Sequence, residues 1–179
     1  MSHRRRPAVP LAGALLASLF AFVPPAYAYP NPVATTDAEY LAYGRVFIGN
    51  TDGKMYAFGA KSGKLLWVKS TGGYIYSSAA VWEKTVYAGS YDGRFYAFDA
   101  ATGDVRWSFP AGGPISGAPT VMAGAVYFST FKDRTFALDA KSGKRLWKFN
   151  DGQYSPLVAD EKRVYLTGHR RVYGLEPQG

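Results

Sequence analysis

The segment AFDAATGDVRW at residues 97–107 decides the fold, because the chain contains three versions of it. AFGAKSGKLLW at residues 57–67 and ALDAKSGKRLW at residues 137–147 follow the same pattern, so each tryptophan lies 40 residues from the next. The recurring positions are the tryptophans Trp67, Trp107 and Trp147, the glycines Gly63, Gly103 and Gly143, and the aspartates Asp99 and Asp139. A fixed period of this length is typical of a protein built from repeated supersecondary units.

Each repeat contains short apolar runs separated by turn residues, and no segment after residue 28 has a helical period. In the second repeat we predict strands at residues 78–82, 85–89, 95–99 and 105–109, with a turn at Glu83-Lys84. The Asp92-Gly93 pair predicts a tight hairpin whose central residues have positive φ. Four short antiparallel strands in every repeat predict the blade of a β-propeller.

The sequence therefore predicts an all-β propeller with three full four-stranded blades and a partial fourth. The blades are expected at about residues 37–76, 77–114 and 115–153, with three strands of the partial blade at 154–179. Residues 29–36 are expected to form a short linker before this domain, which spans residues 37–179.

An incomplete ring leaves its outermost strands unpaired, whereas propellers usually close with about four to eight blades. A strand at residues 33–36 would close a four-bladed ring, although Pro30 and Pro32 restrict that segment to an edge. Alternatively, two chains associate as a homodimer into one larger ring, the sequence is a fragment of a longer reading frame, or the arc stays open. We favour the homodimer or the fragment.

Residues 1–28 have the three parts of a secretory signal peptide. Arg4, Arg5 and Arg6 precede an apolar run at residues 11–23, and Ala26-Tyr27-Ala28 supplies the cleavage pattern. The apolar run would rise only about 20 Å as a helix, which is less than a hydrocarbon core of about 30 Å. We therefore expect a secreted protein, in the periplasm or on the exterior of the cell envelope, with no transmembrane span after the signal is removed.

Charge and cysteine content narrow the classes of partner and of metal site. Removal of three arginines with the signal lowers the net charge from +8 to about +5, which favours acidic partners such as anionic envelope polymers. The positive charges are scattered through the repeats, as on a solvated surface, and we expect no nucleic acid outside the cell. The chain has no cysteine, which excludes disulfides and thiolate metal sites.

The pattern A-x-D-x-x-[TS]-G-x-x-x-W resembles the tryptophan-docking motif of the pyrroloquinoline-quinone-like (PQQ-like) β-propeller repeats. The resemblance covers nearly all of the chain after residue 28, with Gly59 in the aspartate position of the first copy. This family includes quinoprotein alcohol dehydrogenases and the periplasmic lipoprotein subunit of the outer-membrane β-barrel assembly machine. The resemblance implies that the tryptophans stack between neighbouring blades and that the Asp and Ser/Thr side chains hydrogen-bond the turn backbone.

The sequence contains few residues of the types that enzymes use for catalysis. His169 is the only histidine after residue 28, and no G-x-S-x-G nucleophile elbow is present. The related quinoprotein dehydrogenases hold calcium and the quinone in an eight-bladed ring, but their Glu, Asn and Asp ligands cannot be placed on this sequence. We therefore expect no enzyme, no catalytic or metal-binding residue and no bound cofactor, PQQ included. The alternative is a truncated relative of a PQQ-dependent quinoprotein dehydrogenase.

A binding surface is the remaining prediction. In a propeller, the loops between blades and the hairpins between second and third strands share one face. That face is expected to carry Tyr74, Tyr76, Tyr91, Phe131, Lys132, Tyr154, His169, Arg170 and Arg171. Aromatic residues beside arginines are enriched at binding hot spots, although loop aromatics also simply cover blade ends. The sequence thus predicts a non-catalytic binding or scaffolding module for a protein or an anionic envelope polymer.

Overall fold

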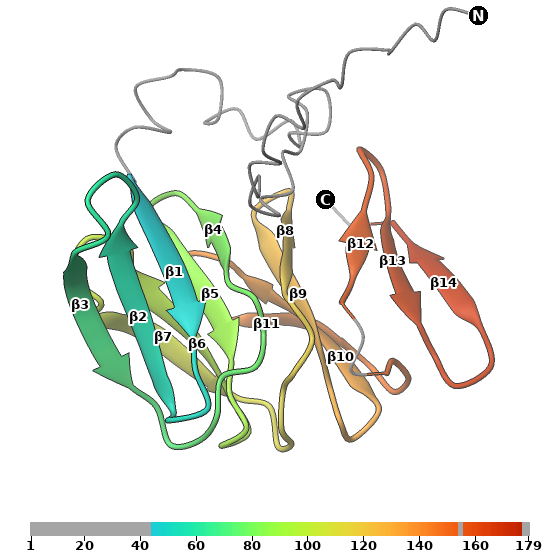
Figure 1. Ribbon diagram of the computed structural model, residues 1–179. Coiled ribbons are helices and arrows are strands. Elements are labelled where there is room, and N and C mark those ends of the chain that lie inside the picture. The colour runs from blue at the N-terminus through green and yellow to red at the C-terminus, as the bar shows by residue number, and fades with distance from the viewer. Residues whose placement is uncertain (1–43, 154–155, 177–179) are drawn as a thin grey trace, which may run out of the picture.

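The computed structural model describes residues 44–153 and 156–176, and this part of the chain forms strands, turns and loops without a helix (Figure 1). The all-β prediction is confirmed. The predicted signal peptide, the linker, the possible closing strand at residues 33–36 and Tyr154 lie outside the described residues. Because the described part contains no helix, it also contains no candidate for a membrane-spanning helix.

The strands form four antiparallel sheets, which follow one another along the chain. Sheet A contains β1 (Arg45–Gly49), β2 (Lys54–Gly59) and β3 (Leu65–Ser70). Sheet B contains β4 (Ala80–Trp82), β5 (Thr85–Gly89), β6 (Arg94–Asp99) and β7 (Val105–Pro110). Sheet C contains β8 (Thr120–Met122), β9 (Ala125–Thr130), β10 (Arg134–Asp139) and β11 (Arg145–Phe149). Sheet D contains β12 (Val158–Ala159), β13 (Val164–Thr167) and β14 (Val172–Leu175).

These sheets match the predicted blades closely. Sheets B and C have the four expected strands, and sheet D has three. Sheet A shows three strands within the described residues, and its first predicted strand would fall before Gly44. Three boundaries in sheet B were wrong: β4 begins at Ala80 rather than at residue 78, β6 begins at Arg94 rather than at residue 95, and β7 ends at Pro110 rather than at residue 109.

The Asp-Gly hairpins differ from the prediction in one respect. Only the glycines take positive φ, at 78° for Gly53 and 82° for Gly93, whereas the preceding aspartates do not. The turn is therefore a three-residue hairpin that ends in a left-handed glycine. In sheet C, Asp133 takes the same conformation with a φ of 53°, which aspartate tolerates better than most residues.

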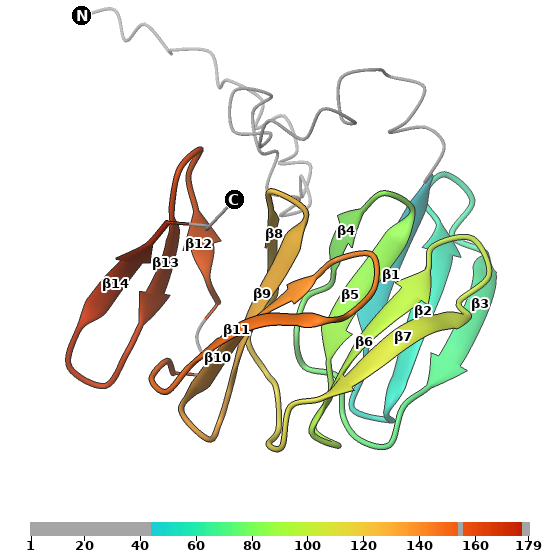
Figure 2. The ribbon, with the colours of Figure 1, turned by 180° about the vertical axis from the view of Figure 1, so that it is seen from behind.

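The four sheets fan out in an open arc, with sheets A and D at its two ends (Figures 1 and 2). The short strands β4, β8 and β12 lie side by side along its inner edge. Three apolar clusters fill the spaces between successive sheets. The first includes Met55, Trp67 and Phe98, the second Tyr87, Phe95 and Phe128, and the third Tyr127, Val164 and Leu166.

The recurring tryptophans connect one sheet to the turn of the next, as the family resemblance implies. The indole N–H of Trp67 in sheet A donates to the Ala100 carbonyl of sheet B at 3.1 Å. The Trp107 N–H makes the same bond to Ala140 of sheet C, also at 3.1 Å. Each indole lies flat against the glycine of that turn, since a Cβ added to Gly103 or Gly143 would stand 2.7 or 2.6 Å from the ring carbon Cδ2.

The aspartate of the motif holds the turn that receives the indole. The Asp99 carboxylate accepts the backbone N–H groups of Ala101 at 2.8 Å and Thr102 at 3.0 Å. Asp139 likewise accepts the N–H of Ser142 at 2.7 Å. The hydrogen bond from Arg106 to Asp99 and that from the Ser142 hydroxyl to Asp139, together with these backbone bonds, keep the pKa of both carboxyls below its usual range. In these two copies the aspartate of the motif therefore holds the turn on which an indole rests.

The contribution of docking can be measured by comparing two glycines with the same backbone conformation. Gly143 and Gly63 have φ values of 71° and 64°, but a Cβ on Gly63 would meet no atom of a described residue within 4 Å. We expect Gly63→Ala to cost about 1 kcal/mol for the left-handed backbone. Gly143→Ala should cost about 1–3 kcal/mol more, because the added methyl overlaps the Trp107 indole. Denaturant unfolding of both variants measures the difference, and equal losses would show that the indole does not rest on the turn.

Candidate functional site

Four aromatic side chains from three loops gather on one end of sheets A, B and C, and we call them the aromatic cluster. Tyr74 and Tyr76 lie between β3 and β4, Tyr91 in the β5–β6 hairpin and Phe131 in the β9–β10 hairpin. The ring centroids of Tyr76 and Tyr91 are 5.0 Å apart, and those of Tyr91 and Phe131 are 5.6 Å apart. Tyr74 contacts both other tyrosines at 6.0 and 6.2 Å.

Local structure directs these rings toward solvent. Ile75 is 2% exposed, and its N–H donates to the Asn50 carbonyl at 3.0 Å. In this extended segment the neighbours of a buried residue point the other way, so Tyr74 and Tyr76 are more than half exposed. The Tyr91 N–H donates to the Tyr74 carbonyl at 2.8 Å, which brings the hairpin against the loop.

The two loop tyrosines are not part of the repeat. The loop after sheet B has an equivalent buried residue, Ile115, in the position of Ile75. Pro114 and Ser116 flank Ile115 in place of the two tyrosines. A blade-to-blade loop in this chain therefore does not require aromatic residues at these positions. The fold therefore does not account for the exposed rings at Tyr74 and Tyr76.

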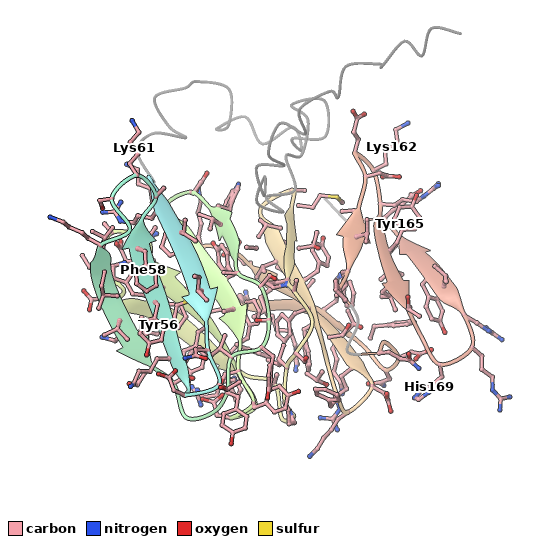
Figure 3. The ribbon with its side chains drawn as sticks, viewed as in Figure 1. Tyr56, Phe58, Lys61, Lys162, Tyr165 and His169 are labelled. Carbon is pink, nitrogen blue, oxygen red and sulfur yellow. The ribbon has the colours of Figure 1, made fainter. Side chains whose placement is uncertain are left out.

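At the end of the molecule that carries the aromatic cluster, the hairpins of sheets C and D present positively charged side chains. Lys132, Arg170 and Arg171 are exposed and form no ion pair among the described residues. His169 lies in the β13–β14 hairpin at the same end of the sheets (Figure 3), and its Nε2 is 3.0 Å from the Asp133 carboxylate. This contact joins the hairpin of sheet D to that of sheet C.

The structure thus brings most of the predicted binding residues to one face. Tyr74, Tyr76 and Tyr91 form a contiguous cluster, and His169, Arg170 and Arg171 lie further along it. Tyr154 is outside the described residues. The face offers aromatic rings steeply inclined to one another, with phenol hydroxyls and a basic border.

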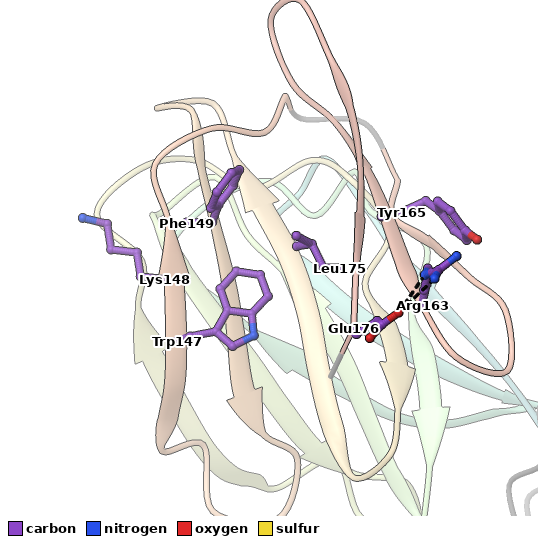
Figure 4. Close-up of a pocket in the computed structure, with 8 residues that line it drawn as sticks. Trp147, Lys148, Phe149, Arg163, Tyr165, Leu175 and Glu176 are labelled. Atoms are coloured by element: carbon purple, nitrogen blue, oxygen red, sulfur yellow. Dashed lines mark hydrogen bonds and ion pairs between the residues drawn. The ribbon is translucent and has the colours of Figure 1, made fainter. Parts of the chain in front are cut away.

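A separate open cavity of about 680 Å³ lies beside β14, at the free edge of sheet D (Figure 4). Two aromatic side chains and a lysine of sheet C form one wall, and on the other side Arg163 pairs with Glu176 at 2.9 Å. It is lined by Trp147, Lys148, Phe149, Arg163, Tyr165, Gly174, Leu175 and Glu176. The sequence analysis did not identify this cavity, because it forms where sheet D lacks a fourth strand within the described residues.

The residues fit a calcium-dependent quinone site poorly. Within residues 44–153 and 156–176, no three Asp, Glu or His side chains come together as a metal ion would require. The carboxylates of Asp52, Asp92, Asp151 and Asp160 each accept a tyrosine hydroxyl instead. No reaction step is therefore derived through calcium or PQQ.

A fan of antiparallel sheets joined by tryptophan docking defines a PQQ-like β-propeller repeat protein. The sequence profile of the family described as outer membrane protein assembly factor BamB matches residues 30–114 and 51–179. The chain belongs to this family. A comparison with curated proteins finds no match.

Solved structures share the fold over part of their length. BamB from Moraxella catarrhalis is 20% identical with a TM-score of 0.64, over 74% of this chain and 43% of that one. The quinohemoprotein alcohol dehydrogenase ADHIIG from Pseudomonas putida HK5 is 28% identical with a TM-score of 0.55, over 61% and 19%. The computationally designed protein Ika4 is 17% identical with a TM-score of 0.67, over 74% and 85%. The chain spans less than half of the length of the two natural proteins.

The ion pair between His169 and Asp133 leads to a prediction about the pKa of His169. The hydrogen bond and charge of Asp133 raise the pKa of His169 above its ordinary value of 6.5. A raised pKa means that the pair stabilises the fold below about pH 6.5 and that this stabilisation is lost as the pH rises through the folded-state pKa. We expect an NMR titration to give His169 a pKa above 6.5 and Asp133→Asn to lower it. An unchanged pKa in Asp133→Asn would contradict the contact.

Proposed function

We propose that this protein is an exported, non-catalytic propeller that binds another protein through the aromatic cluster and its basic border. The observation that carries the proposal is the exposure of Tyr74 and Tyr76, each more than half accessible, in a loop whose equivalent has Pro114 and Ser116. The fold does not require these tyrosines, and their rings form one continuous surface with Tyr91. Large, rigid aromatic side chains contribute strongly to protein binding hot spots.

Charge indicates which kind of partner fits this face. Lys132, Arg170 and Arg171 lie on the hairpins beyond the aromatic cluster, without a carboxylate within ion-pair distance among the described residues. Complementary charge steers association and excludes like-charged partners, so an acidic protein surface is the expected partner. A protein partner is favoured over an envelope polymer because the family is that of an outer membrane protein assembly factor. An assembly role would place the protein in the periplasm or at the cell envelope, as the expected signal peptide does.

The binding proposal can be tested by photo-crosslinking in cells that produce the protein. A photoreactive residue at Lys132, in the β9–β10 hairpin, should capture a protein partner. One at Lys144 should not, because it lies in the turn at the opposite end of β10. The double substitution Tyr74→Ser and Tyr76→Ser should reduce the capture at Lys132 at least about fivefold, because it removes two hot-spot rings.

The same variant should melt within a few degrees of the wild type, because the equivalent loop folds with Pro114 and Ser116. Equal capture at Lys132 and Lys144, or capture that survives loss of both tyrosines, would contradict a binding role for this face.

A second candidate function is that of a shortened quinoprotein dehydrogenase, and the 28% identity to the Pseudomonas putida alcohol dehydrogenase favours it. We expect the purified protein, mixed with PQQ and calcium, to show no change in quinone absorbance and no alcohol-dependent dye reduction. The physical reason is that no three acidic side chains of the described residues come together, and Asp92, Asp99 and Asp151 are engaged by tyrosine hydroxyls or turn backbone. Stoichiometric binding of the quinone would establish the second candidate instead.

A further inference from the structure

The outward side of sheet A, which we call the leading face, is apolar, and none of the other three sheets formed by the described residues covers it. Strand register places Ile48, Tyr56 and Val68 on it in one row, and Val46, Phe58 and Leu65 in the next. Tyr56 and Phe58 stack on each other with centroids 6.1 Å apart, and both are visible on this side of sheet A (Figure 3). Ile48, Leu65 and Val68 are 45–53% exposed.

The equivalent face is covered in every later sheet. In sheet B, Val86, Ala88 and Phe98 occupy the positions of Val46, Ile48 and Phe58, and all are at most 1% exposed beneath sheet A. The stacked pair also recurs there, as Tyr96 and Phe98 at 5.6 Å. The leading face of sheet A therefore has the composition of a blade interface, but no sheet of residues 44–153 and 156–176 packs against it. An exposed apolar patch of this kind marks an interaction surface.

Sheet D ends the arc with the opposite kind of face, which we call the trailing face. Val158, Tyr165 and Val172 lie on it, and the two valines are 61% and 73% exposed. Tyr165 occupies the position of Tyr87, which is buried in sheet B and donates its hydroxyl to the Ala140 carbonyl of the next sheet at 3.0 Å. In sheet D the Tyr165 hydroxyl donates to the Asp160 carboxylate of its own sheet instead.

An ion pair between sheets B and C shows how the two end faces complement each other. Lys141, in the docking turn of sheet C, pairs with Glu83 in the β4–β5 hairpin of sheet B at 3.2 Å. The docking turn of sheet A has Lys61 in the position of Lys141, and the β12–β13 hairpin has Glu161 in the position of Glu83. Lys61 and Glu161 are exposed, and neither forms an ion pair with a described residue.

We propose that the trailing face of one copy of this chain docks on the leading face of a second copy, and that two copies close one ring. Each of the two junctions would bury the apolar residues of both faces and pair Lys61 of one copy with Glu161 of the other. Lys61 and Lys162, the neighbour of Glu161, lie at the same end of the molecule (Figure 3), as such a junction requires. A head-to-tail contact whose rotation closes gives a finite ring instead of a filament.

The geometry of the arc favours two copies over closure of a single chain. Sheets A and D lie apart at the ends of the fan in both views (Figures 1 and 2). Joining them within one chain would require every packed interface to bend, including both tryptophan-docking contacts at 3.1 Å. The fan superimposes on a part of BamB that amounts to 43% of that chain, so its curvature also occurs in a longer propeller.

The mass of the purified chain in solution tests this inference independently of the aromatic cluster. Light scattering at micromolar concentration should give twice the mass of one chain. Lys61→Glu and Glu161→Lys should each raise the dimer dissociation constant at least about tenfold, because each places like charges at both junctions. The double charge reversal should restore the dimer. Lys144→Glu, in the matching turn of sheet C, should leave the mass unchanged.

Val68→Glu provides a second test on the leading face, because it puts a charge on that face without touching the ion pair. It should give a monomer that keeps its far-ultraviolet circular dichroism. A folded wild-type monomer, or an assembly larger than two copies, would overturn the proposal. So would a dimer that withstands both Val68→Glu and the single charge reversals, since it would have to form through another surface.

Discussion

The docking of each tryptophan on the turn of the next sheet is the contact on which the rest of the structure depends. A single three- or four-stranded sheet has two sides to cover, and in this chain each covers one side of its neighbour. The indole sets their relative position because it needs both a hydrogen-bond acceptor and a flat surface. Ala100 and Gly103 supply these to Trp67, and Ala140 and Gly143 supply them to Trp107.

This mode of assembly has consequences at the ends of the arc. Repeat proteins gain stability from nearest-neighbour interfaces, and sheets A and D each have only one such neighbour among the described sheets. Sheet A keeps the apolar composition of an internal sheet, and no described side chain rests on its docking turn at Gly63. The last unit combines exposed valines with an Arg163–Glu176 ion pair. Natural repeat arrays need a polar outer face at their ends, and the leading face does not have one.

The aromatic cluster and the docking motif illustrate two different uses of aromatic residues in one chain. Trp67 and Trp107 recur with the period of the fold and are held by partners that also recur. Tyr74 and Tyr76 break the period, contact mainly each other and Tyr91, and remain exposed. Departure from the repeat therefore separates residues that the fold needs from residues available for binding. Binding residues are commonly carried by loops that a rigid scaffold positions, and these loops are anchored by buried Ile75 and its bond to Asn50.

The sequence by itself determined the strands, the repeat and the docking motif, because these depend on local alternation, turn residues and a fixed period. It also placed Tyr74, Tyr76, Tyr91 and His169 on one face, since hairpins of equivalent strands must end together. The conformation of the Asp-Gly turns was wrong in detail, because hairpin length, rather than the residue pair, sets which residues take positive φ. Only the tertiary structure showed the His169–Asp133 contact, the cavity beside β14 and the Lys141–Glu83 ion pair between sheets B and C. These depend on the rotation between sheets, which arises from packing between residues about 40 positions apart and has no local signal.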